Sequence, residues 1–285
     1  MYYKFIQRFV IAAALTCSAV MGYEGCDAVN SINLFSEEDE IQLGKQLDDE
    51  IRANPAEYPI YTDNPSVKSY ITSRIFKEII ASPAVAKKNV YNYSLEIIDQ
   101  DSVLNAFTTS GGYVYVYTGL LKYVDSEAAL AGVIAHEVGH AEKRHATRRM
   151  TRTYGASLLL GIVLGENPGK LAEISANLFA GLAFLANSRA DENESDEYAI
   201  EILKSTRYYA GSVKFFFEKM RDEGLVDQNS PKILTYLSTH PDPISRIEET
   251  DARLRSRGLP VKSYNSGGSD IYMNEYQSNV RSKIR

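Results

Sequence analysis

The stretch AHEVGHAEKRHATRR, at residues 135–149, constrains this chain more than any other feature, because it holds three of its four histidines. In an α-helix, residues four apart lie on the same face, so His136 and His140 present two imidazole rings to one point. That spacing suits a zinc ion, and Glu137 sets a carboxylate beside it that could serve as a general base. The stretch therefore predicts a helix that supplies part of a metal site.

His145 is nine residues beyond His136, which on a continuous helix directs it to nearly the opposite face. We therefore interpret His145 as structural or solvent-facing. A catalytic zinc site needs a third protein ligand and an open position. Lys143 and Ala146 stand where the extended motif HExxHxxGxxH has its glycine and third histidine, so the third ligand is expected from a separate helix. The acidic segment SRADENESDEYA, residues 188–199, is the best candidate region.

The composition is that of a globular protein with one sizeable core, since 44% of the residues are hydrophobic and 24% are charged. The formal net charge of −6 gives no reason to expect a nucleic-acid partner. Residues 1–25 have the pattern of a signal peptide, with Lys4 and Arg8 before an apolar stretch. Cys26 then resembles a lipoprotein acylation site; the alternative is ordinary cleavage after Gly22, which leaves a free thiol. We expect an exported, periplasmic protein, with a lipid anchor in the first case.

The rest of the chain is organised as one domain with short flanks. Residues 26–35 are expected to form a tether, residues 36–258 the folded domain, and residues 259–285 a polar tail. Most of the domain has helical patterns, and the first helix is expected to be capped by Ser36. Two apolar segments within residues 155–186 are too short to span a bilayer and favour buried helices, although contact with a membrane surface or a lid over the cleft stays open.

Two segments, residues 91–99 and 111–121, alternate at period two and are rich in tyrosine and valine, so we expect one small antiparallel sheet. Tyr113, Tyr115 and Tyr117 share one face of the second strand, and valines occupy the other. Such an aromatic face could line a substrate cleft, and the strand edge could pair with an extended peptide. A half-buried structural strand explains the same pattern equally well.

Four motifs occur in a fixed order along the chain and together carry a resemblance. They are NAFTTSGGYVYVYTGLL before the active helix, HEVGH, the pattern SRxxExxxD beginning at residue 188, and STHPDPISRI near the end. With them the chain resembles the gluzincin metallopeptidases of the HtpX and CAAX-endopeptidase type, and among these the exported, single-domain members similar to BepA and LoiP. The resemblance covers residues 36 to 250. It implies a mostly helical α+β, zincin-like domain, with a small antiparallel sheet beside the HExxH helix.

The resemblance also implies roles for particular residues. Glu192 would be the third ligand of one zinc ion per chain, beside the two histidines of HEVGH, and Glu137 would deprotonate the zinc-bound water. Asp196, one turn further along the same helix face, would hold a ligand histidine in its correct tautomer, with Arg189 also in the second shell. His240 would lie close to the metal. There it would either stabilise the oxyanion or occupy the open zinc position and keep the enzyme inactive.

The implied function is hydrolysis of peptide bonds, with unfolded or misassembled envelope proteins as substrates. An extended substrate would lie along an edge strand near Tyr113 to Tyr117. The residues assigned to this substrate strand are Asn105, Gly112, Tyr113, Val114 and Tyr115.

Other interpretations keep part of the same pattern. A zinc-containing envelope chaperone or assembly factor with weak or latent hydrolytic activity would retain every ligand. A helical protein with fortuitous histidines would bind no stoichiometric metal, and the acidic residues at 188–199 would then form a solvated helix face. The sequence also leaves open a divalent metal other than zinc.

Overall fold

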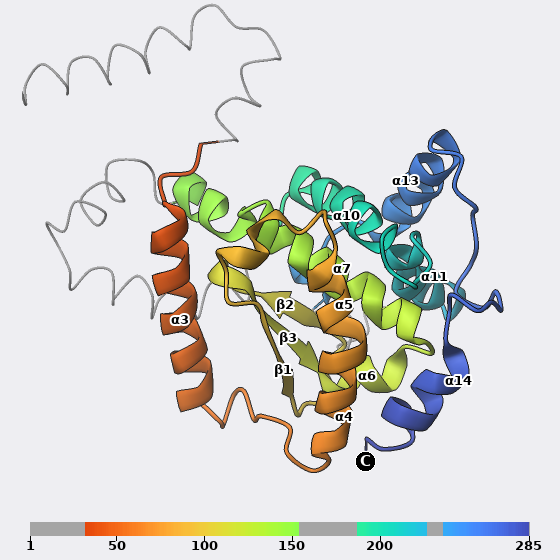
Figure 1. The fold of residues 1–285 in the computed structure, drawn as a ribbon, viewed down its shortest axis with the longest axis horizontal. Helices are drawn as coiled ribbons and strands as arrows, with labels where there is room; N and C mark the ends of the chain where they lie inside the picture. Colours follow the sequence, from red (N-terminus) through yellow and green to blue (C-terminus); the bar gives the residue numbers. More distant parts are fainter. Residues whose placement is uncertain (1–31, 154–186, 227–235, 285) are drawn as a thin grey trace, which may run out of the picture.

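The structure is a computed structural model, and it describes residues 32–153, 187–226 and 236–284. Within these ranges the fold is α+β and mostly helical, with one small sheet (Figure 1). The expected signal peptide, the candidate lipidation site Cys26 and the apolar segments within 155–186 lie outside the described residues.

The first helix, α3 (Glu37–Ala53), begins where the capping pattern predicts. The hydroxyl of Ser36 accepts a hydrogen bond from the backbone N–H of Asp39, and the Asp39 carboxylate accepts one from the backbone N–H of Ser36. This reciprocal pair satisfies two otherwise free donors of the first turn. Helix α3 buries Leu43, Leu47 and Ile51 on its inner stripe.

A second helical stretch runs without interruption from residue 65 to residue 81. It consists of α4 (Pro65–Tyr70), the π-helical turn η1 (Ile71–Phe76) and α5 (Lys77–Ala81). The short 3₁₀ turn η2 (Ala86–Asn89) then leads to the sheet.

The sheet has three strands in the order β1-β3-β2, namely β1 (Ser94–Ile98), β2 (Ala106–Thr108) and β3 (Tyr113–Tyr117). Strands β1 and β3 are parallel, and β2 is antiparallel to β3. The predicted antiparallel pairing of the first and last strands is therefore wrong. The short strand β2 lies between them in sequence, and the turn η3 (Ser110–Gly112) reverses the chain after it. Positive φ angles of 74° at Gly111 and 91° at Gly112, which glycine adopts without strain, make this reversal possible.

Strand β3 is central, so the prediction that it offers an edge to substrate is also wrong. Its valines, Val114 and Val116, pack in the main hydrophobic core. Tyr115 and Tyr117 pack on the other face in a smaller core with Ile51 of α3. Tyr115 is only 1% exposed and donates a hydrogen bond to Asp48. Among the described residues, β1 and β2 form the two edges of the sheet.

After α6 (Thr118–Tyr123), the HExxH sequence lies on α7 (Glu127–Glu142). Ser126 caps α7, and its hydroxyl accepts the backbone N–H of Ala129. The helix does not continue through the histidine-rich stretch as predicted: it ends at Glu142, and Arg144 has a left-handed φ of 59°. Residues 145–153 form a new helical run after this turn. This break redirects His145.

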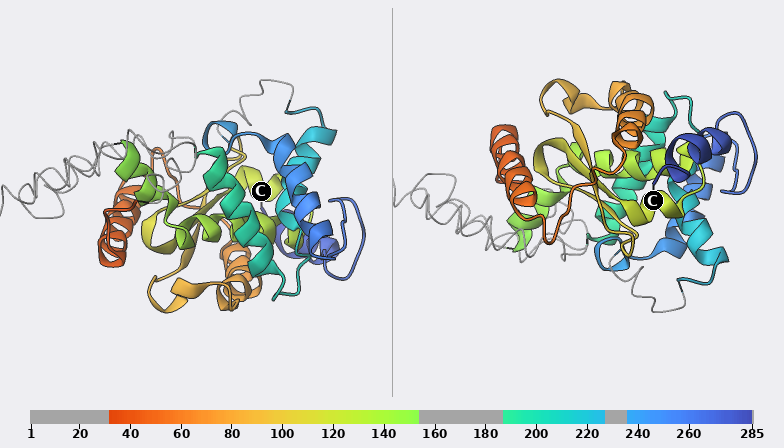
Figure 2. Two further views of the ribbon diagram at one scale, coloured as in Figure 1. Left: turned by 90° about the horizontal axis from the view of Figure 1, so that it is seen from above. Right: turned by 90° about the horizontal axis from the view of Figure 1, so that it is seen from below.

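The remaining helices gather on the side of the molecule opposite α3, as Figures 1 and 2 show. They are α10 (Arg189–Leu203), η4 (Ser212–Lys214), α11 (Phe215–Asp222), α13 (Pro243–Ser256), α14 (Met273–Tyr276) and the π-helical η5 (Gln277–Arg281). Residues 259–284, which are predicted to belong to a polar tail, instead pack against the domain. Ile271, Tyr276 and Val280 are fully buried in the main core, because apolar residues recur at near-helical spacing within a polar sequence.

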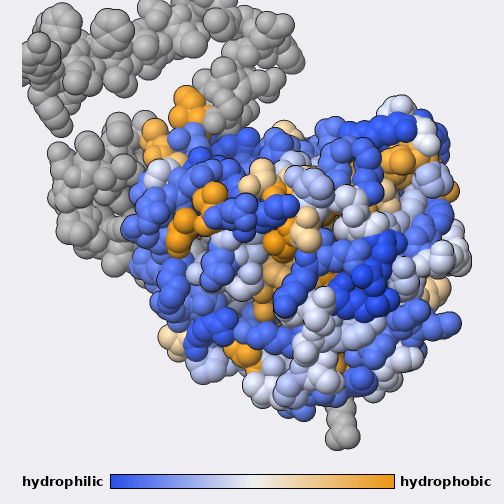
Figure 3. Space-filling model, viewed as in Figure 1, coloured by the Kyte–Doolittle hydropathy of each residue, from blue (hydrophilic) through white to orange (hydrophobic). Residues whose placement is uncertain are grey.

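Figure 3 shows one face of the molecule as a mainly hydrophilic surface with small apolar groups. The large apolar side chains that are exposed in the described ranges are separated along the chain: Ile32, Val90, Ile244, Val261 and Met273. In the parts of the chain that the structure describes, every helix is too short or too polar to cross a membrane.

Candidate metal centre

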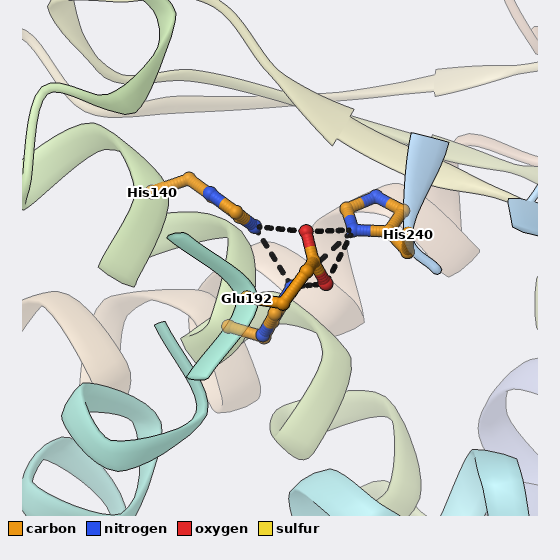
Figure 4. Close-up of side chains that lie close together, drawn as sticks. His140, Glu192 and His240 are labelled. Atoms are coloured by element: carbon orange, nitrogen blue, oxygen red, sulfur yellow. Dashed lines mark hydrogen bonds and ion pairs between the residues drawn. The ribbon is translucent and has the colours of Figure 1, made fainter. Parts of the chain in front are cut away.

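Four side chains bring possible metal ligands together, with their ligand atoms all within 4.8 Å of one another: His136, His140, Glu192 and His240. Helix α7 supplies the first two, α10 supplies Glu192, and His240 precedes α13. All four are at most 5% exposed. In Figure 4, His140 and His240 approach the Glu192 carboxylate from opposite sides. The metal-ligating residues that the sequence predicts thus lie at one buried point, together with His240.

The spacing of these donors fits a small metal ion. Nε2 of His136 lies 2.9 Å from Nε2 of His140, and 3.4 Å from a carboxylate oxygen of Glu192. Nδ1 of His240 lies 3.1 Å from both oxygens of that carboxylate. Donors in a tetrahedral zinc site are about 3.4 Å apart, given zinc–ligand distances near 2.1 Å. Three imidazoles and a carboxylate are also the ligand types that zinc prefers.

Asp196 orients His136. Its Oδ1 lies 2.8 Å from Nδ1 of His136, so Nδ1 carries the proton and Nε2 turns its lone pair toward the other donors. Asp196 and Glu192 both come from α10, which begins with a capping box between Ser188 and Asp191. Their four-residue spacing places the two carboxylates on one face of the helix.

Arg246, a residue without an assigned role in the sequence analysis, completes the inner cluster. It is 2% exposed, and its Nε and Nη2 each lie 2.7 Å from an oxygen of Asp196. Its Nη1 lies 2.6 Å from Oε2 of Glu192. The signal that could have found it is a charge argument, because three carboxylates assigned to one buried site require a buried cation.

The charges of the cluster shift its pKa values strongly. Burial alone would raise the pKa of Glu192, but His240 and Arg246 hold it well below its usual range. Burial and the charge of Arg246 lower the pKa of His136, yet hydrogen bonds with Asp196 and Glu192 raise it overall to about 9. The surroundings therefore stabilise positive charge at His136, which is what a bound cation would supply.

Glu137 differs from the other carboxylates of the site. It is 1% exposed, and its Oε1 accepts no hydrogen bond from the residues that the structure describes. Nε2 of His240 lies 3.6 Å from this oxygen. Burial raises the pKa of Glu137. A carboxylate with a free oxygen and a raised pKa is suited to accept a proton and release it again.

A cavity of about 290 Å³ adjoins the cluster. Glu137, His140 and His240 line it, and so do Phe107 and Thr108 of β2. Its lining also includes apolar and aromatic side chains, among them Leu47, Tyr58, Val103 and Tyr117. An extended peptide that reaches the metal cluster would therefore run beside β2.

Other predicted site residues lie apart from the donors. Arg189 is in the first turn of α10 and its side chain is 79% exposed, where it pairs with Asp242, so its expected place near the metal is wrong. Gly112 belongs to the turn before β3, and Val114 belongs to the core. Asn105 lines the cavity, but its side-chain oxygen accepts the backbone N–H of Ala106.

His145 is not the solvent-facing residue that a continuous helix would make it. It is 1% exposed, and its Nδ1 lies 2.6 Å from Nδ1 of His140.

Helices α7 and α10 touch at Gly139, inside the HEVGH sequence. A Cβ atom at this position would lie 2.7 Å from Oγ of Ser195 and 3.0 Å from its carbonyl oxygen. The hydroxyl of Ser195 in turn donates a hydrogen bond to the carbonyl oxygen of His136. Helices α7 and α10 are thus in direct contact at a point between the donors that they carry.

Comparison with known proteins places this site in a family context. The sequence model of peptidase family M48 matches residues 67–254. The putative beta-barrel assembly-enhancing protease of Vibrio cholerae is 34% identical over 172 residues, which are 56% of this chain and 34% of that protein. The beta-barrel assembly-enhancing protease of Escherichia coli is 30% identical over 229 residues, 77% of this chain and 44% of that protein.

The mitochondrial metalloendopeptidase OMA1 of Schizosaccharomyces pombe is 29% identical over 202 residues, 70% of this chain and 56% of that protein. The chain therefore spans from about a third to just over half of the length of these relatives. The family match covers most of the chain and includes α7 and α10, which carry three of the four donors. On this match, the chain belongs to peptidase family M48.

Proposed function

We propose that this protein is a zinc-dependent metalloendopeptidase that hydrolyses exported polypeptides in envelope protein quality control. The observation that carries the proposal is the convergence of His136, His140 and Glu192 beside a carboxylate, Glu137, that has a free oxygen. Zinc held there would polarise the scissile carbonyl and lower the pKa of a nearby water molecule.

The protein side chains would do the remaining work. Oε1 of Glu137 would accept a proton from that water and later donate it to the leaving amine. Asp196 would keep the proton of His136 on Nδ1, so that Nε2 stays available as a ligand atom. Arg246 would balance the negative charge of the buried carboxylates.

The substrate would pair with the outer edge of β2, which has no partner strand among the residues that the structure describes. The carbonyl oxygen of Asn105 and the backbone N–H of Thr109 form hydrogen bonds with β3. Because the backbone groups of successive strand residues point alternately to the two sides, those of Thr108 point to the opposite edge. Thr108 also lines the cavity. A peptide that adds a strand at this edge would be held by main-chain hydrogen bonds and directed to the donor cluster.

Unfolded or misassembled envelope proteins are the proposed substrates, in keeping with the names of the relatives from Vibrio cholerae and Escherichia coli. Residues 1–25 would direct export to the periplasm, and residues 26–35 would tether the domain through a lipid on Cys26. Labelling with a radioactive fatty acid tests the anchor, because Cys26→Ser should remove all label while the wild-type protein retains it.

A second candidate is a zinc-containing chaperone or assembly factor whose hydrolytic activity is latent. The position of His240 favours it, because a catalytic zinc site keeps an open position and His240 adds a fourth protein donor. In that state His240 would have to leave before a substrate carbonyl could reach the metal.

Purified full-length protein, incubated with an unfolded model substrate with and without a chelator, tests the proposal. Metal content is measured in parallel. Glu137→Gln should keep one zinc per chain and lose cleavage by about 10²–10⁴-fold, whereas the exposed Glu38→Gln should behave as wild type. Cleavage that survives chelation would refute the metalloendopeptidase. A biological role that persists in Glu137→Gln would favour the chaperone.

A further inference from the structure

We propose that His145 and Glu194 form a positioning pair for the metal ligand His140, so that α10 orients both histidines of HEVGH. The inference rests on the proposed zinc site. Its starting point is a short series of contacts that links three buried or half-buried side chains. Nδ1 of His145 lies 2.6 Å from Nδ1 of His140, and Nε2 of His145 lies 3.0 Å from Oε2 of Glu194.

The path of the backbone creates this contact. Because α7 ends at Glu142 and Arg144 adopts a left-handed conformation, the chain turns and brings the ring of His145 back against that of His140. The ring centroids are 4.7 Å apart, with the planes at 71°. A helix that continued past Glu142 would have carried His145 away from the site.

The hydrogen-bonding capacity of the three groups fixes where the protons lie. Glu194 is a carboxylate and can only accept, so Nε2 of His145 must donate to it. Nε2 of His140 faces the other metal donors, so its lone pair belongs there and the proton of a ligating His140 ring lies on Nδ1. Nδ1 of His140 then donates to Nδ1 of His145, and the proton of the His145 ring lies on Nε2, the atom that donates to Glu194.

Glu194 is itself held in place. Nη2 of Arg148 lies 2.6 Å from its Oε2, and Nζ of Lys143 lies 3.3 Å from its Oε1. Glu194 follows Glu192 by two residues, about 200° around the helix, so α10 presents Glu192 to the metal and Glu194 to the far side of His140.

The two ligand histidines are thus oriented by the same helix through different routes. His136 donates directly to Asp196, whereas His140 reaches Glu194 through the ring of His145. Outer-shell partners of this kind change metal affinity by about 10–100-fold when they are removed.

The test measures zinc affinity by competition with a chromophoric chelator, and the absorption spectrum of the protein loaded with Co²⁺. His145→Ala should weaken zinc binding by about 10–100-fold and alter the Co²⁺ spectrum. His145→Gln, whose amide can both accept and donate, should restore part of the affinity. Glu197→Ala, an exposed neighbour on α10 that pairs with Arg257, serves as the matched control and should change neither readout.

The double variant His145→Ala/Glu194→Ala should lose no more affinity than His145→Ala alone, because the carboxylate acts through the ring. Fully additive losses, or zinc affinity within twofold of wild type in His145→Ala, would overturn the proposal. If His145→Ala does not fold, His145→Gln and Glu194→Ala decide by the same readouts. A wild-type protein that binds no zinc would instead refute the proposed function, so the two failures are distinguishable.

Discussion

Nη1 of Arg246 lies 2.6 Å from a carboxylate oxygen of Glu192, with both side chains at most 2% exposed. Two nitrogens of the same guanidinium donate hydrogen bonds to the carboxylate of Asp196. The Arg246 cation therefore pairs both with Glu192, a candidate metal ligand, and with Asp196, which orients the candidate ligand His136.

Replacement of this cation should destabilise the whole domain. Arg246→Met leaves the carboxylates of Glu192 and Asp196 buried without their partner, which costs about 3–5 kcal/mol of unfolding free energy. Arg255→Ala removes a side chain that is 66% exposed and pairs with Asp251 on the same helix, and should cost less than about 1 kcal/mol. Urea unfolding of the zinc-loaded proteins measures both. Equal losses would show that the inner cluster contributes no more than a surface pair.

Removal of His240 should raise basal peptide cleavage, since its Nδ1 would no longer compete for the fourth position of the metal. His240→Ala is compared with wild type by initial rates on an unfolded substrate at equal zinc content. Ser245→Ala, near the start of α13, is the control. A fall in rate with unchanged zinc content would assign His240 to stabilisation of the oxyanion instead.

The pairing of substrate with β2 predicts a specific effect of proline. Thr108→Pro removes a backbone N–H that points away from β3, and proline is tolerated on edge strands. We expect KM to rise at least about tenfold while zinc content and folding stay normal, the equivalent of one lost hydrogen bond of about 1.5 kcal/mol. Thr108→Val keeps the N–H and should leave KM unchanged. An unaltered KM in Thr108→Pro would exclude β2 as the docking edge.

Gly132 reports on the packing of α7. A Cβ atom there would lie 2.4 Å from the carbonyl oxygen of Ser212, so one backbone must shift. Gly132→Ala should lower the unfolding free energy by about 1–3 kcal/mol. Around Gly267 no atom lies within 4 Å, and Gly267→Ala should stay within about 0.5 kcal/mol of wild type. Denaturant midpoints of the two variants give the comparison; similar values would mean that α7 and the turn at Ser212 can separate freely.

The buried tyrosines make stability fall at alkaline pH. Burial raises the pKa of Tyr209 to about 12, and burial and the carboxylate of Asp48 raise the pKa of Tyr115 well above its ordinary value. Unfolded tyrosine ionises near pH 10, so above that pH the folded state binds more protons than the unfolded state. The stabilisation is complete below about pH 10 and is lost as the pH rises toward the folded values, by about 1.4 kcal/mol per pH unit for each such tyrosine.

Urea titrations at several pH values, followed by tyrosinate absorbance, measure this loss. Tyr209→Phe should reduce the slope of the unfolding free energy against pH by the equivalent of about one proton. A decline of the same steepness in Tyr209→Phe would assign the alkaline loss to other groups.

The sequence predicts the donors of the site better than their surroundings. Local spacing is enough for His136 and His140, because the two lie one turn apart on one helix. The roles of Glu192 and Asp196 come from the resemblance to the gluzincin family. Arg246 escapes this reasoning, since it reaches the cluster from another helix and nothing in its local sequence marks it as buried.

His145 and the sheet are missed for a different reason. The end of α7 depends on a single left-handed residue, Arg144, whose type does not favour that conformation. Strand β2 has three residues, too few to show an alternating pattern, and without it the pairing of β1 with β3 is assigned the wrong direction.

The contact between Gly139 and Ser195 has a consequence for ion selectivity. Because α7 and α10 meet there without an intervening side chain, the spacing of the two helix backbones at this point cannot widen by a change of rotamer. Calcium requires six to eight oxygen ligands at about 2.3–2.6 Å, and magnesium requires octahedral oxygen coordination. A metal bound by the three histidine nitrogens and the Glu192 carboxylate would therefore be selected against both ions by ligand chemistry, even where these ions are abundant.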